Sequence, residues 1–139
     1  MNDSAEKLFN LRLEHTGTVG QIADAISCGG EDGVLMYLYV KDQKLHAGEI
    51  AEALQLTSGR IANILKVLEK KRYIQRKPGQ DDKRKILVSL TSSGRSYIAE
   101  VKERAVARYD DVLRKLNPHD AATLCELIGR LLERMDEAQ

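Results

Sequence analysis

Polar and small residues recur along one side of residues 57–66, where they could contact the bases of duplex DNA. They are Thr57, Ser58, Gly59, Arg60, Asn63 and Lys66. In the major groove, arginine pairs with guanine and asparagine with adenine, while serine or glycine lets a backbone approach closely. The other side carries Ile61, Ile64 and Leu65, at the spacing of an apolar helix face. The pattern predicts a helix that buries one face and offers the other to a major groove.

A second amphipathic stretch precedes this one and completes a helix pair. Residues 47–54 carry apolar side chains at positions i, i+3, i+4 and i+7. Residues 55–57 leave only a short connection, and Thr57 or Ser58 can cap the second helix with a side-chain oxygen. The spacing predicts a helix-turn-helix. The alternative is a solvated helix pair in another all-helical domain, because short motifs also arise by chance.

The residues that follow the helix pair have the pattern of a basic hairpin. Residues 73–77 form a short mixed run that ends in Pro78-Gly79, and apolar residues alternate in strand period over 86–90. The tip between them, residues 79–85, is polar and must lie in water or against a polyanion. A helix-turn-helix followed by such a hairpin is a winged helix. Residues 44–46 are a candidate third strand beside it.

The charge of the chain is concentrated on this region. Residues 44–95 contain 12 Lys or Arg and five Asp or Glu, whereas the remaining residues contain 10 and 16, so a net charge of +1 hides a strong asymmetry. A positive winged helix would be attracted to phosphates, and we expect Lys83, Arg84 and Lys85 to contact DNA. A charge run can also be a solvated face, but this one coincides with the motif.

Three short runs carry a family resemblance. They are Leu68-Glu69-Lys70-Lys71, Asp82-Lys83-Arg84 and Leu90-Thr91-Ser92-Ser93-Gly94-Arg95. With them, the block from Glu49 to Gly94 resembles the MarR family of bacterial transcriptional regulators. The resemblance implies that Arg84 enters the minor groove and that Asp82 helps to fix the wing. The chain departs from the family at Arg72, where members usually carry a glycine that ends the helix in a left-handed conformation.

Long helices are predicted at both ends of the chain. Apolar residues step by three and four over 8–26, 98–116 and 121–135, with a bend expected near Gly17 and Gly20. Thr91 and Asn117 are natural helix caps. We expect these stripes to bury one another in a homodimer, as the MarR resemblance also implies; packing within one subunit is the alternative. The predicted dimerisation residues are Leu8, Leu11, Leu124, Ile128, Leu131 and Met135.

Other residue types define candidate regulatory sites. His15, Tyr37, Tyr39 and Tyr109 are expected to line a small-effector pocket where the terminal helices meet the winged helix. Cys28 is the candidate for redox sensing, whereas Cys125 lies on a helix flank and is expected to pack in a core. The three histidines are dispersed and no catalytic signature or metal-ligand spacing occurs, so no enzyme, metal or cofactor is predicted.

The sequence therefore predicts a mainly α (α+β) fold in one MarR-like domain, 1–139. Residues 31–91 would form the winged helix-turn-helix lobe with a two- to three-stranded wing, and residues 1–30 and 92–139 the dimerisation helices. With two distant cysteines, no secretory leader and no apolar run near ~20 residues, a cytoplasmic protein away from membranes is expected. The predicted function is a homodimeric repressor that binds a pseudo-palindromic operator in double-stranded DNA and is released by a small effector. The alternatives are a winged helix for assembly or sequence-neutral binding, and a cysteine-based redox regulator.

Overall fold

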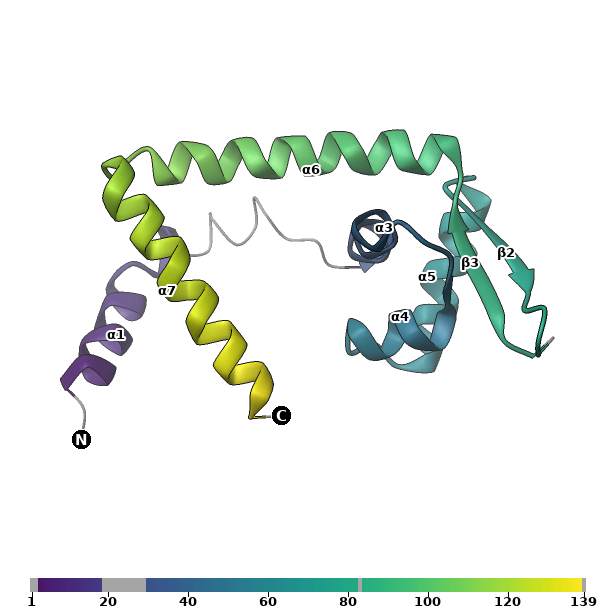
Figure 1. Ribbon diagram of the computed structural model, residues 1–139, viewed down its shortest axis with the longest axis horizontal. Coiled ribbons are helices and arrows are strands. Elements are labelled where there is room, and N and C mark those ends of the chain that lie inside the picture. Colours follow the sequence, from purple (N-terminus) through teal and green to yellow (C-terminus); the bar gives the residue numbers. More distant parts are fainter. Residues whose placement is uncertain (1–2, 19–29, 83, 139) are drawn as a thin grey trace. The chain divides into compact units, whose positions relative to one another are not determined.

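The computed structural model describes residues 3–18, 30–82 and 84–138. The chain forms two compact units, Met1–Glu103 and Arg104–Gln139, and helix α6 (Ser92–Leu113) runs across the division. The first unit contains a winged helix with a small three-stranded sheet, which confirms the predicted mainly helical fold class (Figure 1).

The core of the first unit lies between three helices, the sheet and the start of α6. The helices are α3 (Gly30–Lys41), α4 (Ala47–Ala53) and α5 (Ser58–Lys70). The buried side chains are Val34, Leu35, Leu38, Leu45, Ile50, Ala51, Ile61, Ile64, Leu65, Leu68, Ile74, Val88 and Ile98. The stripe that the sequence predicted for α5 is therefore its buried face, because its residues at i, i+3, i+4 and i+7 turn toward one core.

The sheet forms the wing and ties it to the helices. Its strands are β1 (Leu45–His46), β2 (Ile74–Pro78) and β3 (Ile86–Leu90), in the order β1-β3-β2 with antiparallel pairing throughout. The Gly79 amide donates to the Lys85 carbonyl at 2.7 Å, which closes the hairpin at its predicted tip. The candidate strand at residues 44–46 is confirmed as β1, which pairs with β3.

Side-chain caps start three helices where the sequence predicted them. The Thr57 hydroxyl accepts a hydrogen bond from the Arg60 amide at 3.1 Å at the start of α5. The Thr91 hydroxyl accepts from the Gly94 amide at 3.0 Å, and the Asn117 side-chain oxygen from the Asp120 amide at 2.9 Å. Asn117 opens α7 (Pro118–Glu137), which has proline in its first turn, a position where the missing amide costs nothing.

The N-terminal helix is interrupted two residues earlier than the sequence indicated. Helix α1 spans Asp3–Glu14, and the interruption lies at His15, not at Gly17. The Thr16 hydroxyl donates to the carbonyls of Leu13 (2.8 Å) and Arg12 (3.2 Å), so a side chain takes up helix carbonyls at the break. The remainder of the predicted segment, including Gly20, lies outside the described residues.

Arg72 adopts the left-handed conformation that its place in the chain requires. Its φ is 64°. Its amide donates to the Glu69 carbonyl and the Tyr73 amide to the Leu68 carbonyl, each at 3.0 Å, which is the pairing of a Schellman motif. The departure from the family pattern therefore changes the residue and keeps the helix ending. An arginine at this φ is strained, because its Cβ crowds the following carbonyl.

Replacing Arg72 with glycine is expected to raise the free energy of unfolding by about 0.5–1 kcal/mol, because relief of left-handed strain outweighs the greater unfolded-state entropy of glycine. Urea denaturation measures the change. Lys70→Gly is the matched control, since Lys70 ends α5 in helical conformation and glycine there should destabilise by about 1 kcal/mol. Equal destabilisation by the two substitutions would contradict the strain at Arg72.

The second unit has no buried side chain on α7. Cys125 is a free, exposed cysteine, so the prediction that it packs in a core is wrong for the single chain. The reason is that the large apolar side chains of the α7 stripe lie open, including Leu124 and Leu131. Among the described residues of the chain, no helix combines the length and the apolar character needed to cross a membrane.

Candidate nucleic-acid interface

The exposed face of α5 presents the residues that the sequence predicted for base contacts. Thr57, Ser58, Gly59, Arg60, Asn63 and Lys66 are all exposed. Thr57 has an additional role, since its hydroxyl caps the helix and is committed to the Arg60 amide. The face therefore carries arginine and asparagine, which form paired hydrogen bonds with guanine and adenine, on a helix whose other side is fixed in the core.

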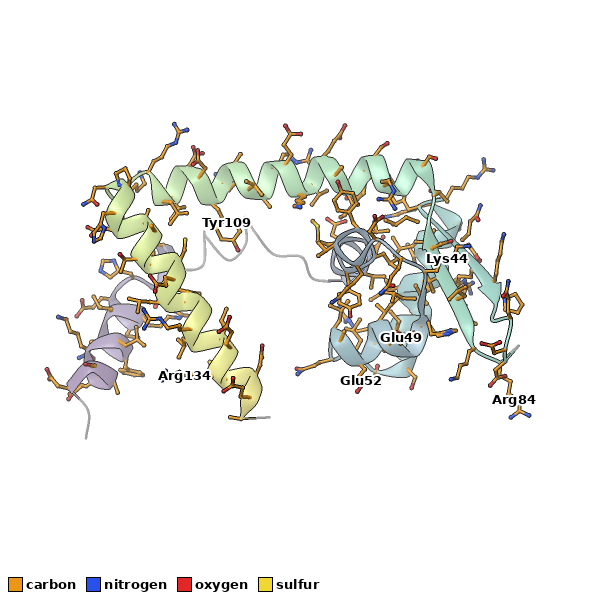
Figure 2. All side chains as sticks on the ribbon, in the orientation of Figure 1. Lys44, Glu49, Glu52, Arg84, Tyr109 and Arg134 are labelled. Carbon is orange, nitrogen blue, oxygen red and sulfur yellow. The ribbon has the colours of Figure 1, made fainter. Side chains whose placement is uncertain are left out.

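The wing tip holds its basic residues by a backbone turn organised by Asp82. The Asp82 carboxylate accepts a hydrogen bond from the Arg84 amide at 2.9 Å. The main-chain carbonyl of Asp82 accepts a hydrogen bond from the Lys85 amide at 3.0 Å. Figure 2 shows the Arg84 side chain at the end of the hairpin, pointing away from the helices. Lys85 is also exposed, whereas Lys83 lies outside the described residues. The geometry gives Asp82 a specific means of orienting Arg84.

The same turn depends on Gly79, whose contact the sequence did not reveal. A Cβ at this position would lie 2.9 Å from the Asp82 carbonyl oxygen and 3.1 Å from that of Lys85. Both neighbours are backbone atoms of the tip, so they could yield only by a shift of the tip itself. Pro78-Gly79 was predicted as a turn from its residue types alone; the reason for glycine is this close approach.

An ion pair links the wing to α5 and was missed by sequence reasoning. The Arg76 guanidinium donates to the Glu69 carboxylate at 2.9 Å. The hydrogen bond from Arg76 lowers the pKa of Glu69, and the bond to Glu69 raises the pKa of Arg76, so both groups are charged at neutral pH. The alternation of β2 held a signal, because Arg76 lies two residues after buried Ile74 and shares its face.

Other side-chain contacts join α3 to the ends of α5 and α6. Lys71 forms an ion pair with Glu31 at 2.7 Å, and the Tyr97 hydroxyl donates to Asp32 at 3.0 Å. The hydrogen bond to Glu31 raises the pKa of Lys71, while burial and then the bond to Asp32 raise that of Tyr97. These four side chains, with the stacked ring of Tyr73, line a cavity of about 400 Å³. None of the residues predicted for the effector pocket is among them.

Two of the four predicted effector residues lie on α3. The Tyr37 ring is 5.6 Å from the Lys41 ammonium, and the Tyr39 ring lies beneath two cations, Arg95 and Lys102, each at 5.7 Å. His15 follows α1 and is exposed; Tyr109 is exposed in the second unit (Figure 2). The pocket stays a prediction, since its members belong to separate units. Cys28, the redox candidate, lies outside the described residues.

The predicted dimerisation residues are all exposed in the single chain. They are Leu8, Leu11, Leu124, Ile128, Leu131 and Met135, with exposed fractions of 39% to 67%. The dimer stays a prediction, and so does the division of the chain into dimerisation helices and a DNA-binding lobe. Within the described residues no group of three His, Cys, Asp or Glu side chains is placed to hold a metal ion.

The winged helix and its exposed basic tip are the features of a DNA-binding domain. Residues 33–108, more than half of the chain, match the family described as the winged helix DNA-binding domain. The chain belongs to this family.

The relatives of the chain are regulators of transcription, not enzymes. It is similar to the HTH-type transcriptional repressor YetL of Bacillus subtilis, at 25% identity over 76% of this chain and 64% of YetL. It is 30% identical to the transcriptional regulator SarZ of Staphylococcus aureus over 56% of this chain and 53% of SarZ. The chain thus spans less than two thirds of these relatives.

A solved structure shows the same fold over nearly the whole chain. A mutant form of MarR from Escherichia coli superposes with a TM-score of 0.71 at 18% identity, covering 95% of this chain and 98% of that one. This likeness confirms the fold that the resemblance to the MarR family implied.

Proposed function

We propose that this protein is a sequence-specific DNA-binding repressor of transcription. The observation that carries the proposal is the pairing of two exposed elements in one winged helix: the polar face of α5, with Arg60 and Asn63, and the basic wing tip, with Arg84. The first has the chemistry for base edges in the major groove, and the second is placed for phosphates or the minor groove. Membership of the winged helix DNA-binding domain family supports this assignment.

We further propose that it acts as a homodimer on a pseudo-palindromic operator. The exposed apolar stripe of α7 supports a second copy as partner, because large open apolar surfaces are rare on monomers. A two-fold dimer would place its two α5 helices in major grooves about 34–36 Å apart, which sets the spacing of the half-sites.

The rival function is a winged helix for assembly or for sequence-neutral binding. Titration of a duplex selected by the protein from a random pool, against an unselected duplex, separates the two. A repressor should prefer the selected duplex by about 10³-fold or more, whereas a sequence-neutral protein should bind both alike with the same salt dependence.

Replacing Arg60 with alanine should weaken binding to the selected duplex by about 1–3 kcal/mol and relax preference at one base pair, because a bidentate base contact is lost. Arg84→Ala should weaken all duplexes more evenly and lower the slope of log K against log salt by about one. Arg104→Ala, on the exposed side of α6, is the control for loss of one positive charge. Wild-type affinity in both Arg60→Ala and Arg84→Ala would refute the proposal that α5 and the wing tip contact DNA.

We also propose that a small effector releases the DNA. Half-buried Tyr37 and Tyr39 could form apolar walls for an aromatic ligand, and His15 and Tyr109 are the other two residues that the sequence predicts for its pocket. Phenolic carboxylates, peroxide and zinc can be screened against DNA binding by the wild type, His15→Ala and Cys28→Ser. Release that persists in His15→Ala and vanishes in Cys28→Ser would replace the pocket with redox chemistry.

A further inference from the structure

The two proposed reading elements are joined by a short and unusual connection. Helix α5 ends at Lys70 and strand β2 begins at Ile74, so three residues separate them, and one of these is the left-handed Arg72. Buried Leu68 and Ile74 anchor the two sides of this connection in the core. The core and the pairing of β1 with β3 fix the base of the wing at Ile74 and Val88, and the direction of the exposed hairpin beyond this base depends on further contacts.

Arg76 is placed to set that direction. It pairs in register with Val88 of β3, whose side chain is fully buried, so Arg76 lies on the inner face of the hairpin. Its neighbours Gln75 and Lys77 lie on the other face and are exposed. Arg76 is not free for phosphates, because its guanidinium points toward α5 and has a charged partner there.

The partner is Glu69, in the last turn of α5. The guanidinium and the carboxylate are 2.9 Å apart, and their side chains are 26% and 42% exposed. Glu69 is the carboxylate of α5, whose remaining charged residues are basic. A negative charge on a helix that is proposed to lie against DNA would by itself oppose binding. Any favourable contribution of Glu69 to DNA binding must therefore come from its ion pair with Arg76.

We propose that Glu69 and Arg76 are positioning residues that fix the angle of the wing on α5, so that Arg84 and the Arg60–Asn63 face contact one duplex together. This inference rests on the proposed function. It assigns the pair no contact with DNA, since Arg76 donates inward to the carboxylate. The wing tip is several residues beyond the pair, so a small rotation at Arg76 displaces Arg84 by a larger distance.

The direction in which Glu69→Ala changes DNA affinity tests the proposal. Glu69→Ala removes a negative charge, so electrostatics alone would tighten DNA binding and steepen its salt dependence. If the pair positions the wing, the same variant should bind the selected duplex about tenfold more weakly and lower the salt slope by about one, as expected for the loss of a charged wing contact. Base preference at the Arg60 position should not change. Glu52→Ala is the matched control, because Glu52 is an exposed carboxylate on α4 in the same unit (Figure 2).

Two further variants separate positioning from a general loss of structure. In the Glu69→Ala background, Arg84→Ala should have little further effect, because the wing contact is already lost. The charge exchange Glu69→Arg with Arg76→Glu should recover most of the affinity at an unchanged net charge. Urea midpoints of all variants should stay close to that of the wild type, since a partly exposed ion pair contributes little to stability.

The outcomes are distinct. Wild-type or tighter binding by Glu69→Ala overturns the inference, and so does weaker binding that simply adds to the effect of Arg84→Ala. Failure of the unaltered protein to distinguish selected from random duplexes would instead overturn the proposed function.

Discussion

Replacing Gly94 with alanine should lower the free energy of unfolding of the winged-helix unit by about 3 kcal/mol, at the upper end of what overpacking costs. A Cβ at Gly94 would lie 2.0 Å from the carbonyl oxygen of Tyr73 and 2.8 Å from its carbonyl carbon. These are backbone atoms, so no side-chain rotation can relieve the clash. The start of α6 would have to move away from the connection between α5 and the wing.

The hydrogen bonds around Gly94 explain why this movement is costly. The Thr91 amide donates to the Tyr73 carbonyl at 3.1 Å, and the Thr91 hydroxyl donates to the Arg72 carbonyl at 2.6 Å. The same hydroxyl accepts from the Gly94 amide. A shift of α6 would therefore disturb its cap and also the anchor of the left-handed Arg72.

Chemical denaturation followed by circular dichroism measures this effect. Gly48→Ala is the matched control, because a Cβ added at Gly48 in α4 would meet nothing within 4 Å, and alanine there should stabilise by about 0.5–1 kcal/mol. A Gly94→Ala variant as stable as wild type would show that α6 does not approach Tyr73 this closely.

Local patterns in the sequence predicted the elements of the winged helix well. The stripe of α5, its Thr57 cap and the alternation of β3 each depend on neighbours within a few residues, where propensity and periodicity act. The wing turn was likewise marked by Pro78-Gly79. These signals were sufficient for the order of the elements and for the side of α5 that stays exposed.

Contacts between distant residues could not be derived in this way. Gly94 was noticed as part of a run, but the reason for glycine is the approach of Tyr73, 21 positions earlier. The bond between Glu69 and Arg76 depends on how the strand leaves the helix, which is set by the backbone at Arg72. The sequence identified Arg72 as a departure from the family, yet its left-handed φ follows from the hydrogen bonds around it rather than from its own preference.

The open stripe of α7 shows a different limit, because its large apolar side chains stay exposed in the single chain. Leu124, Ile128, Leu131 and Met135 are spaced by four, three and four residues, and they are 39% to 58% exposed. This spacing matches the seam of packed helices. Cys125 was predicted to be buried on the same ground, and it is exposed here for the same reason. The periodicity indicates that a surface is to be covered without specifying what covers it.

Leu131→Glu is expected to dissociate the proposed dimer. Leu131 is 58% exposed in the single chain, near the middle of the stripe. A two-fold interface contains each substitution twice, so losing two buried leucines should cost about 4 kcal/mol, or nearly a thousandfold in the dimer dissociation constant, before the cost of burying two carboxylates. A monomer would hold one recognition helix and lose the second half-site, so DNA affinity should fall with dimerisation.

Sedimentation velocity over a range of protein concentrations measures this dissociation, with DNA binding measured on the same samples. Ala122→Glu is the matched control, because it adds one carboxylate to the exposed side of α7 that carries Glu126 and Glu133, away from the stripe. It should remain dimeric. A Leu131→Glu protein that sediments as an unaltered dimer would remove this stripe from the interface, whereas a monomer with full DNA affinity would show that one recognition helix is enough.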